Sequence, residues 1–435
     1  MKGEIFVGKT RDGFPIALWD KQRSEHVQII GSTGRGKSSS VIVPWMVQDF
    51  LSGKNVILID GKGDRGIPEI LDNWVFGDKR REVILFDLGD VETSATTNPL
   101  KFGTAAQICD RIFSTFEFEN SYYRDQSYQA LLMVVEMLQI ASEEVSFKEI
   151  YLSLLDDGHL TELCTGIQSL AQSDKKTNQH KSETLRLALS YLAQNFNQRQ
   201  EKISGLVSQL RPYATGELAI LLNGEVDGKK YFSLSELVRN ENKTVAKAIV
   251  ILIPTLLYQK TASRLGQMFL QEIAWAIACR KTTQFLPVFL DEFSAFVYKE
   301  FIQIINKARS ARVGFHLSHQ SMGDLESISP DFAKAIVTNT NVKCVLGLND
   351  PETADYFARF FGTRTSEKLT ERAEKKTFGD LERSGQMSVR DVEEYRIHPN
   401  RLKRFTHGQG VLSVMVDGDA VIEEIQFEPV PEGGG

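Results

Sequence analysis

A stretch near the start of the chain has the residue types that bind phosphate groups. It reads Val27-Gln28-Ile29-Ile30-Gly31-Ser32-Thr33-Gly34-Arg35-Gly36-Lys37-Ser38, and residues 31–38 satisfy the pattern G-x-x-x-x-G-K-[ST] in full. Glycines let successive backbone N–H groups point at phosphate oxygens, where a side chain would block the approach. Lys37 can reach the β- and γ-phosphates, Ser38 can hold Mg²⁺, and the helix that begins here adds the positive end of its dipole. The pattern predicts a site for a nucleoside triphosphate and Mg²⁺ in this phosphate-binding loop (P-loop).

A pair of carboxylates follows a later apolar run. Phe285-Leu286-Pro287-Val288-Phe289-Leu290 leads directly into Asp291 and Glu292. Asp291 would bind Mg²⁺ through water, and Glu292 would polarise the water that attacks the γ-phosphate. Because strand ends are often acidic, the pair alone is a weak signal. Together with a complete P-loop, it predicts a site that hydrolyses the bound nucleotide.

Residues Val313 to Gln320 predict another strand. Gln320, at its carboxyl end, is placed to touch the γ-phosphate and report its presence; a surface glutamine is the alternative. His316 and His319 are three residues apart, which on a strand sends them to opposite faces, so we expect no metal site there.

These residues need a sheet that brings them to one edge. Apolar runs at 27–30, 55–60, 82–87 and 245–253 are typical of buried parallel strands, whose carboxyl ends form the ligand-binding edge of open α/β sheets. The residues Gly61-Lys62-Gly63-Asp64 follow one run at this edge, as part of the site or as a simple tight turn. Residues 4–19 predict a hairpin around Asp12-Gly13.

The pattern becomes helical after about residue 104. Leu131, Val134, Val135 and Leu138 recur at helical spacing, and capping boxes begin at Ser146 and Ser233. We therefore predict an all-α domain, residues 104–238, inserted into an α/β nucleotide-binding domain formed by residues 1–103 and 239–435. Residues 364–392 are charged and poor in aliphatic side chains, which predicts a mobile loop or a short hairpin.

Composition bounds the class of protein. The chain has 435 residues and a net charge of −6, so there is no global basic signature for nucleic acid, although a basic channel can be local or formed by an oligomer. Its four widely spaced cysteines predict free thiols in a reducing compartment. The longest apolar run, 248–257, is far short of the ~20 residues of a membrane-spanning helix, so we expect a soluble chain. The position of the P-loop close to Met1 and the final Gly433-Gly434-Gly435 are both features of a piece cut from a longer protein.

Taken in order, these motifs resemble those of type IV secretion coupling proteins of the TraG/TraD class, relatives of the hexameric FtsK/HerA DNA-pumping ATPases. The resemblance is carried by residues 26–38, 59–64, 98–100, 290–293, 307–321 and 348–354. It covers most of the chain, and the predicted helical insertion falls where the family has its all-α domain, which faces the relaxosome and secretion substrates.

The resemblance implies a RecA-like P-loop NTPase domain with an inserted all-α domain, assembled as a homo-hexamer around a channel, with ATP and Mg²⁺ between neighbouring subunits. An isolated soluble fragment would be a monomer. By position, Lys37 and Ser38 bind phosphate and Mg²⁺. Asp291 and Glu292 act on the metal and the water, and Gln320 senses the γ-phosphate. Arg309 corresponds to an arginine finger that reaches the neighbour's site; a helix-surface arginine is the alternative, and Arg312 competes for the role.

The sequence departs from the family in two places. Family members carry an N-terminal pair of transmembrane helices, which this sequence lacks, so the chain is a soluble piece or variant, or a partner attaches it to the membrane. We expect it at the cytoplasmic face of the bacterial inner membrane. The family often has proline where this chain has Gly61, which weakens any role of Lys62.

The leading hypothesis is an ATPase that recruits single-stranded DNA bound to a relaxase and passes it to the proteins of a type IV secretion channel for conjugative transfer. A second is a receptor that mainly docks secreted protein substrates through residues 104–238. A third is a non-secretory DNA translocase of the HerA kind.

Overall fold

The computed structural model describes residues 3–75, 77–171, 178–239, 245–375 and 381–428. Within these residues the chain forms two compact units. The P-loop unit comprises the described residues of Gly3–Trp45 and Ser318–Pro431, and the insertion unit comprises those of Met46–Leu317. We describe each unit by itself.

The main sheet of the P-loop unit has the strand order β2-β1-β13-β12-β9-β3. Only β3 and β9 run parallel; the other neighbours are antiparallel. The strands are β1 (Glu4–Thr10), β2 (Pro15–Trp19), β3 (Val27–Ile30), β9 (Val342–Leu346), β12 (Gln409–Val416) and β13 (Asp419–Phe427). The pairing of β1 with β2 confirms the hairpin predicted around Asp12-Gly13, and Gly13 takes the positive φ of 86° that the turn needs.

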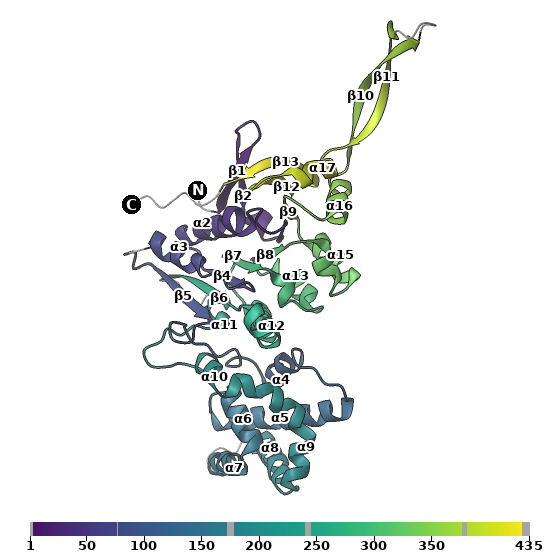
Figure 1. Cartoon of the computed structure of the whole chain (residues 1–435). Helices are drawn as coiled ribbons and strands as arrows, with labels where there is room; N and C mark the ends of the chain where they lie inside the picture. Colours follow the sequence, from purple (N-terminus) through teal and green to yellow (C-terminus); the bar gives the residue numbers. More distant parts are fainter. Residues whose placement is uncertain (1–2, 76, 172–177, 240–244, 376–380, 429–435) are drawn as a thin grey trace. The chain divides into compact units, whose positions relative to one another are not determined.

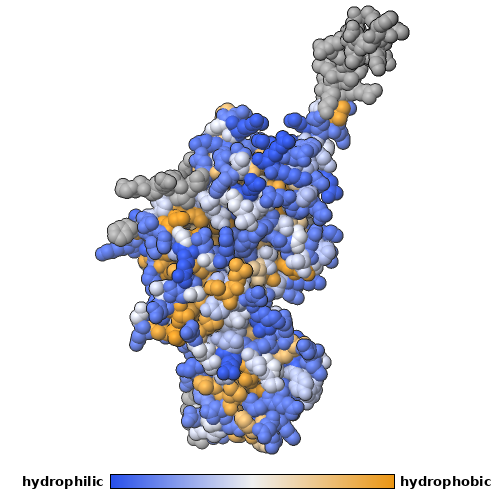
Figure 2. Space-filling model, in the orientation of Figure 1, coloured by the Kyte–Doolittle hydropathy of each residue, from blue (hydrophilic) through white to orange (hydrophobic). Residues whose placement is uncertain are grey.

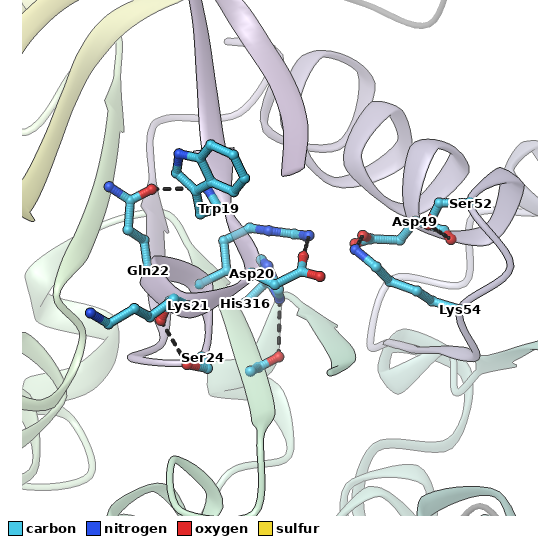
Figure 3. Close-up of polar contacts among 11 residues, drawn as sticks. Trp19, Asp20, Lys21, Gln22, Ser24, Asp49, Ser52, Lys54 and His316 are labelled. Carbon is cyan, nitrogen blue, oxygen red and sulfur yellow. Dashed lines mark hydrogen bonds and ion pairs between the residues drawn. The ribbon is translucent and has the colours of Figure 1, made fainter. Parts of the chain in front are cut away.

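Short helices connect these strands. They are α1 (Asp20–Arg23), α14 (Met322–Glu326), α15 (Pro330–Asn339), α16 (Pro351–Phe361) and α17 (Pro399–Arg404). The α16 start follows from its sequence, because Asp350 accepts hydrogen bonds from the N–H groups of Glu352 and Thr353, and Pro351 occupies a position that needs no N–H. At the start of α1, the preceding Trp19 N donates to Gln22 Oε1 over 2.8 Å (Figure 3).

The described residues of the segment 364–392 form two paired strands, and residues 376–380 lie outside the described residues. Strands β10 (Thr363–Lys375) and β11 (Leu381–Tyr395) pair antiparallel as a separate two-stranded sheet (Figure 1). Of the two predicted alternatives the hairpin is correct, but it is much longer than expected. The reason is that strand pairing is made by backbone groups, so a charged sequence does not prevent it.

The sheet of the insertion unit has the order β8-β7-β4-β6-β5, and every described pair in it is parallel. Its strands are β4 (Val56–Asp60), β5 (Arg81–Asp87), β6 (Ala246–Leu252), β7 (Leu286–Asp291) and β8 (Val313–His319), of which β8 ends in the P-loop unit. All residues of β4 and β7 are buried, as their continuous apolar runs predict.

The described elements between Ala105 and Arg239 are all helices. They are α4 (Ala105–Phe113), α5 (Ser121–Ala141), α6 (Phe147–Leu155), α7 (Asp157–Ala171), α8 (Asn178–Leu192), α9 (Phe196–Ala214), α10 (Glu217–Leu222) and α11 (Leu234–Arg239). The predicted apolar face of α5 is buried. On the face drawn in Figure 2, hydrophobic residues gather over part of this helical segment. The predicted domain limits, 1–103 with 239–435 and 104–238, stay a prediction, because the two compact units divide the chain elsewhere.

Further helices complete the insertion unit. They are most of α2 (Val43–Leu51), then α3 (Gly66–Val75), α12 (Thr255–Cys279), η2 (Phe293–Ala295) and α13 (Phe301–Ala308). At the carboxyl end of α2, Lys54 pairs with the fully buried Asp49 over 2.8 Å (Figure 3). This pair joins the end of the helix to the start of β4, because the buried carboxylate needs a partner.

Candidate functional site

The P-loop leaves the buried strand β3 and enters an irregular helix. Gly34 and Gly36 have φ angles of 76° and 93°, which only glycine adopts readily. The loop is followed by a π-helical turn, η1 (Lys37–Ile42), closed by a bond from Val43 N to Ser38 O. Pro44 comes next and has no N–H to offer to a regular helical bond, so the sequence itself favours an altered first turn.

The side chain of Lys37 reaches from the end of the P-loop back to its start. Its ammonium group is buried and donates to the carbonyl oxygen of Gly31 over 2.7 Å. This bond joins the two ends of the P-loop and holds the cation where phosphate oxygens would compete for it.

Gln320 lies beside the P-loop. Thr33 Oγ1 donates to Gln320 Oε1 over 2.9 Å, and Gln320 N donates to Asp324 Oδ2 over 2.8 Å. The contact places the glutamine at the first half of the loop. Its role as a γ-phosphate sensor stays a prediction.

The residue before Gln320 is a buried, neutral histidine. Burial lowers the pKa of His319 to about 4, and the positive charge of Lys37 acts in the same direction. Its Nδ1 lies 2.8 Å from the carbonyl oxygen of Ser321, which can only accept, so Nδ1 carries the proton. Nε2 therefore accepts from Gln28 Nε2 over 2.9 Å. This pair anchors the segment that carries Gln320 to β3.

The other side of the P-loop is held by residues that sequence reasoning missed. Arg35 donates through Nη2 to Asn349 Oδ1 over 3.0 Å and through Nη1 to the carbonyl oxygen of Phe405 over 3.2 Å. Asn349 N donates to Ser32 Oγ over 2.7 Å. Asn349 belongs to the segment 348–354 that carries part of the family resemblance, which is the signal that could have identified it.

Asn349 and Gln320 are themselves connected, which closes a ring of hydrogen bonds. Met322 N, two residues after Gln320, donates to Thr353 Oγ1 over 3.1 Å. Thr353 N donates to Asp350 Oδ2 over 2.9 Å, and Asp350 adjoins Asn349. We call this the P-loop ring; it holds both sides of the loop in one network.

In the insertion unit, Asp291 ends β7 as predicted and lies opposite Asp60, which ends β4. Both side chains are buried. Burial, and secondarily the charge of Asp291, raise the pKa of Asp60 to about 6. Asp60 accepts from Lys62 N over 2.8 Å and from Asp64 N over 2.7 Å, so residues 61–64 form a tight turn closed on their own strand. Sequence reasoning did not select Asp60.

Glu292 has a strained backbone. Its φ of 49° lies in the left-handed region, and its N–H donates to Asp291 Oδ1 over 3.0 Å. Such a conformation in a non-glycine residue costs about 1–3 kcal/mol and is concentrated at functional sites. Arg309 caps the carboxyl end of α13, and its competitor Arg312 has a φ of 56°.

The structure therefore groups the predicted residues in two sets. The P-loop unit brings Gln320 to Gly31–Ser38, and the insertion unit holds Asp291, Glu292 and Arg309. No cluster of three metal-ligating side chains occurs among the described residues. Ser38 in the P-loop unit and Asp291 in the insertion unit each carry an oxygen of the kind that Mg²⁺ takes, and Mg²⁺ usually has few protein ligands and completes its shell with water and phosphate.

Comparisons with known proteins find one similar family model. Residues 286–406 match a family model described as the TraM recognition site of TraD and TraG. A search of characterised protein sequences finds no match.

Similar solved structures include the bacterial conjugative coupling protein TrwBdeltaN70, which is 14% identical over 98% of this chain and 89% of its own, with a TM-score of 0.64. The plasmid coupling protein TrwB in complex with ADP and Mg²⁺ is also 14% identical, over 97% and 89%, with a TM-score of 0.61. VirB4 of Thermoanaerobacter pseudethanolicus is 15% identical over 99% and 98%, with a TM-score of 0.60.

These matches confirm the resemblance to coupling proteins of the TraG/TraD class. They also confirm the predicted fold class, an α/β, RecA-like P-loop NTPase fold with an all-α domain. Among the described residues, no helix is long and apolar enough to cross a membrane.

Proposed function

We propose that this chain is the ATP-hydrolysing motor of a type IV secretion coupling protein, which recruits relaxase-bound, single-stranded DNA to the secretion channel for conjugative transfer. The observation that carries the proposal is a complete P-loop with Gln320 bonded to it, in a chain whose fold follows that of coupling proteins over almost its full length.

In this proposal each site residue has one task. Lys37 exchanges the Gly31 carbonyl for β- and γ-phosphate oxygens, which are its stronger partners because they are charged. Ser38 and Asp291 hold Mg²⁺, which neutralises phosphate charge when bound. Glu292 orients the attacking water, and Gln320 reports the γ-phosphate through Thr33. Arg309 stabilises the transition state in the site of a neighbouring subunit.

Because Arg309 would act in the site of a neighbouring subunit, the proposal requires an oligomer. We propose a homo-hexamer at the cytoplasmic face of the inner membrane, with residues 1–103 and 239–435 forming the motor domain. Residues 104–238 form the domain that meets the relaxosome. The family match at residues 286–406 supports a relaxosome partner for this chain.

The test is ATP hydrolysis with and without single-stranded DNA at low salt, where phosphate contacts are strongest. We expect DNA to stimulate the wild type, and Lys37→Ala to lower turnover at least ~100-fold because a preorganised phosphate contact is lost. Lys21→Ala, an exposed lysine on α1 of the same unit, is the matched control. Hydrolysis that DNA neither binds nor stimulates would remove the DNA-motor role and leave an ATPase.

One observation favours the second candidate, a receptor for protein substrates. A pocket of about 300 Å³ opens among α5, α8 and α9. Its wall is apolar at Leu132, Met133 and Ile203, and polar at Gln126 and Gln194. Such a wall can take an apolar side chain of a peptide. Met133→Glu should then weaken peptide capture without changing the ATPase rate.

A further inference from the structure

The turn between α17 and β12, residues Phe405–Gly408, packs against the second half of the P-loop. Gly408 N donates to the carbonyl oxygen of Arg35 over 3.0 Å, and Arg35 Nη1 returns a bond to Phe405 O. His407 Nε2 lies 3.1 Å from Ser39 Oγ, in hydrogen-bond contact. The first helical residue after the P-loop motif is therefore bonded to a histidine that is distant in the sequence.

The two backbones meet closely because both carry glycine. A Cβ atom added to Gly36 would lie 3.0 Å from Gly408 N and 3.1 Å from His407 Cε1. Gly408 itself has a φ of 71°, which a larger residue adopts with strain. This contact is thus built into the backbone of both segments.

Further hydrogen bonds hold the turn in place. Phe427 N, at the end of β13, donates to Gly408 O over 2.7 Å, and Thr406 N donates to Gln409 Oε1 over 3.2 Å. Phe405 is buried, whereas His407 and Ser39 are exposed. A fixed turn therefore presents an imidazole ring at the open rim of the P-loop.

The contact of Gln320 with the P-loop indicates how a bound nucleotide would be oriented along the loop. Gln320 contacts Thr33, in the first half of the loop, and His407 contacts Ser39, beyond its other end. A nucleotide whose γ-phosphate meets Gln320 has its α-phosphate toward Ser39 and its ribose beyond that, next to His407. Imidazole has two nitrogens, so His407 can keep Ser39 and still bond a ribose oxygen.

We propose that the turn Phe405–Gly408 is the nucleoside wall of the ATP site and that His407 bonds the ribose. The proposal rests on the proposed function, because it takes the orientation of ATP from the role of Gln320. It adds a binding residue whose partner is the sugar rather than the phosphates.

The test compares ligands with and without a nucleoside. Binding of ATP, ADP and inorganic tripolyphosphate, each with Mg²⁺, is measured by calorimetry for the wild type and for His407→Ala. We expect the variant to bind ATP and ADP about 10-fold more weakly, as for one lost hydrogen bond in a polar site, and to bind tripolyphosphate within twofold of the wild type. His407→Gln, which keeps a donor and an acceptor, should recover part of the loss.

Two variants separate this from a merely structural role. Ser39→Ala should weaken all three ligands, because Ser39 lies at the α-phosphate. His180→Ala, an exposed histidine on α8, should change none. Equal weakening of all three ligands by His407→Ala, or no change in any, would refute the ribose contact. If the wild type bound tripolyphosphate but not ATP or ADP, the ATPase function itself would be wrong.

Discussion

The two units differ in how their buried polar groups are balanced. In the P-loop unit, hydrogen bonds and short stretches of backbone close the P-loop ring, and the buried imidazole of His319 is held neutral. In the insertion unit, two buried carboxylates face each other, and the pKa of one is raised.

In the proposed function, this difference separates nucleotide binding, by the P-loop unit, from hydrolysis, by residues of the insertion unit. A closed network keeps the P-loop in one shape, so little order has to be created when phosphate arrives. The facing carboxylates are instead held in mutual repulsion, which a cation would relieve. In the proposed function, the P-loop unit would bind the phosphates and the insertion unit would supply the carboxylate for the metal. The predictions below test this contrast, from the largest expected effect to the smallest.

The strained acid should carry the largest effect. Glu292→Gln removes the carboxylate that we propose orients the water but keeps the side-chain shape, so we expect ATP hydrolysis to fall at least ~100-fold with ATP affinity unchanged. Steady-state turnover and equilibrium binding measure the two separately. Glu300→Gln, an exposed glutamate before α13, is the matched control. Retained turnover in Glu292→Gln would assign the water to another residue.

Because His319 is neutral in the folded chain, we expect the free energy of unfolding to fall at acidic pH. The pKa of His319 is about 4 in the folded chain against an ordinary 6.5, so the unfolded chain binds the extra proton between these values. Its contribution to stability is present above pH 6.5 and is lost as pH falls toward 4, by up to roughly 3 kcal/mol. His319→Gln should remove this slope. Urea unfolding at pH 4.5, 5.5 and 6.5 checks it, and an unchanged slope would contradict the neutral assignment.

The raised carboxylate predicts the opposite sign. The pKa of Asp60 is about 6 in the folded chain against 3.8, so the folded chain binds the extra proton. The contribution of Asp60 to the free energy of unfolding is present below pH 3.8 and is lost as pH rises through 6, by up to about 3 kcal/mol. In metal-free buffer, Asp60→Asn should therefore steepen the rise of unfolding free energy with pH that His319 causes. An unchanged or flatter profile in this variant would mean that folding does not raise the pKa of Asp60.

The P-loop ring should show the smallest effect, because Asn349 is exposed. Asn349→Ala removes the partner of Arg35 Nη2, and we expect about 1 kcal/mol of lost unfolding free energy together with weaker ATP binding. Asn400→Ala, an exposed asparagine on α17 of the same unit, should change neither. Loss of stability without loss of affinity would separate the ring from nucleotide binding.

The sequence by itself determined the parts whose causes are local. Glycine spacing defines the P-loop, continuous apolar runs define β4 and β7, and helical spacing defines the buried face of α5. The apolar run of β7 also predicted that Asp291 and Glu292 come at its carboxyl end. These features depend on neighbours a few residues away, which a pattern can record.

Only the tertiary structure decided which residues contact the P-loop and which lie opposite Asp291. Arg35 meets an asparagine 314 residues away, and Ser39 meets a histidine 368 residues away. The facing of Asp60 and Asp291 depends on the register of β4 with β7, which no local pattern encodes. The physical reason is that hydrogen bonds and charge repulsion act through distance in space, and sheet order, not sequence order, sets that distance.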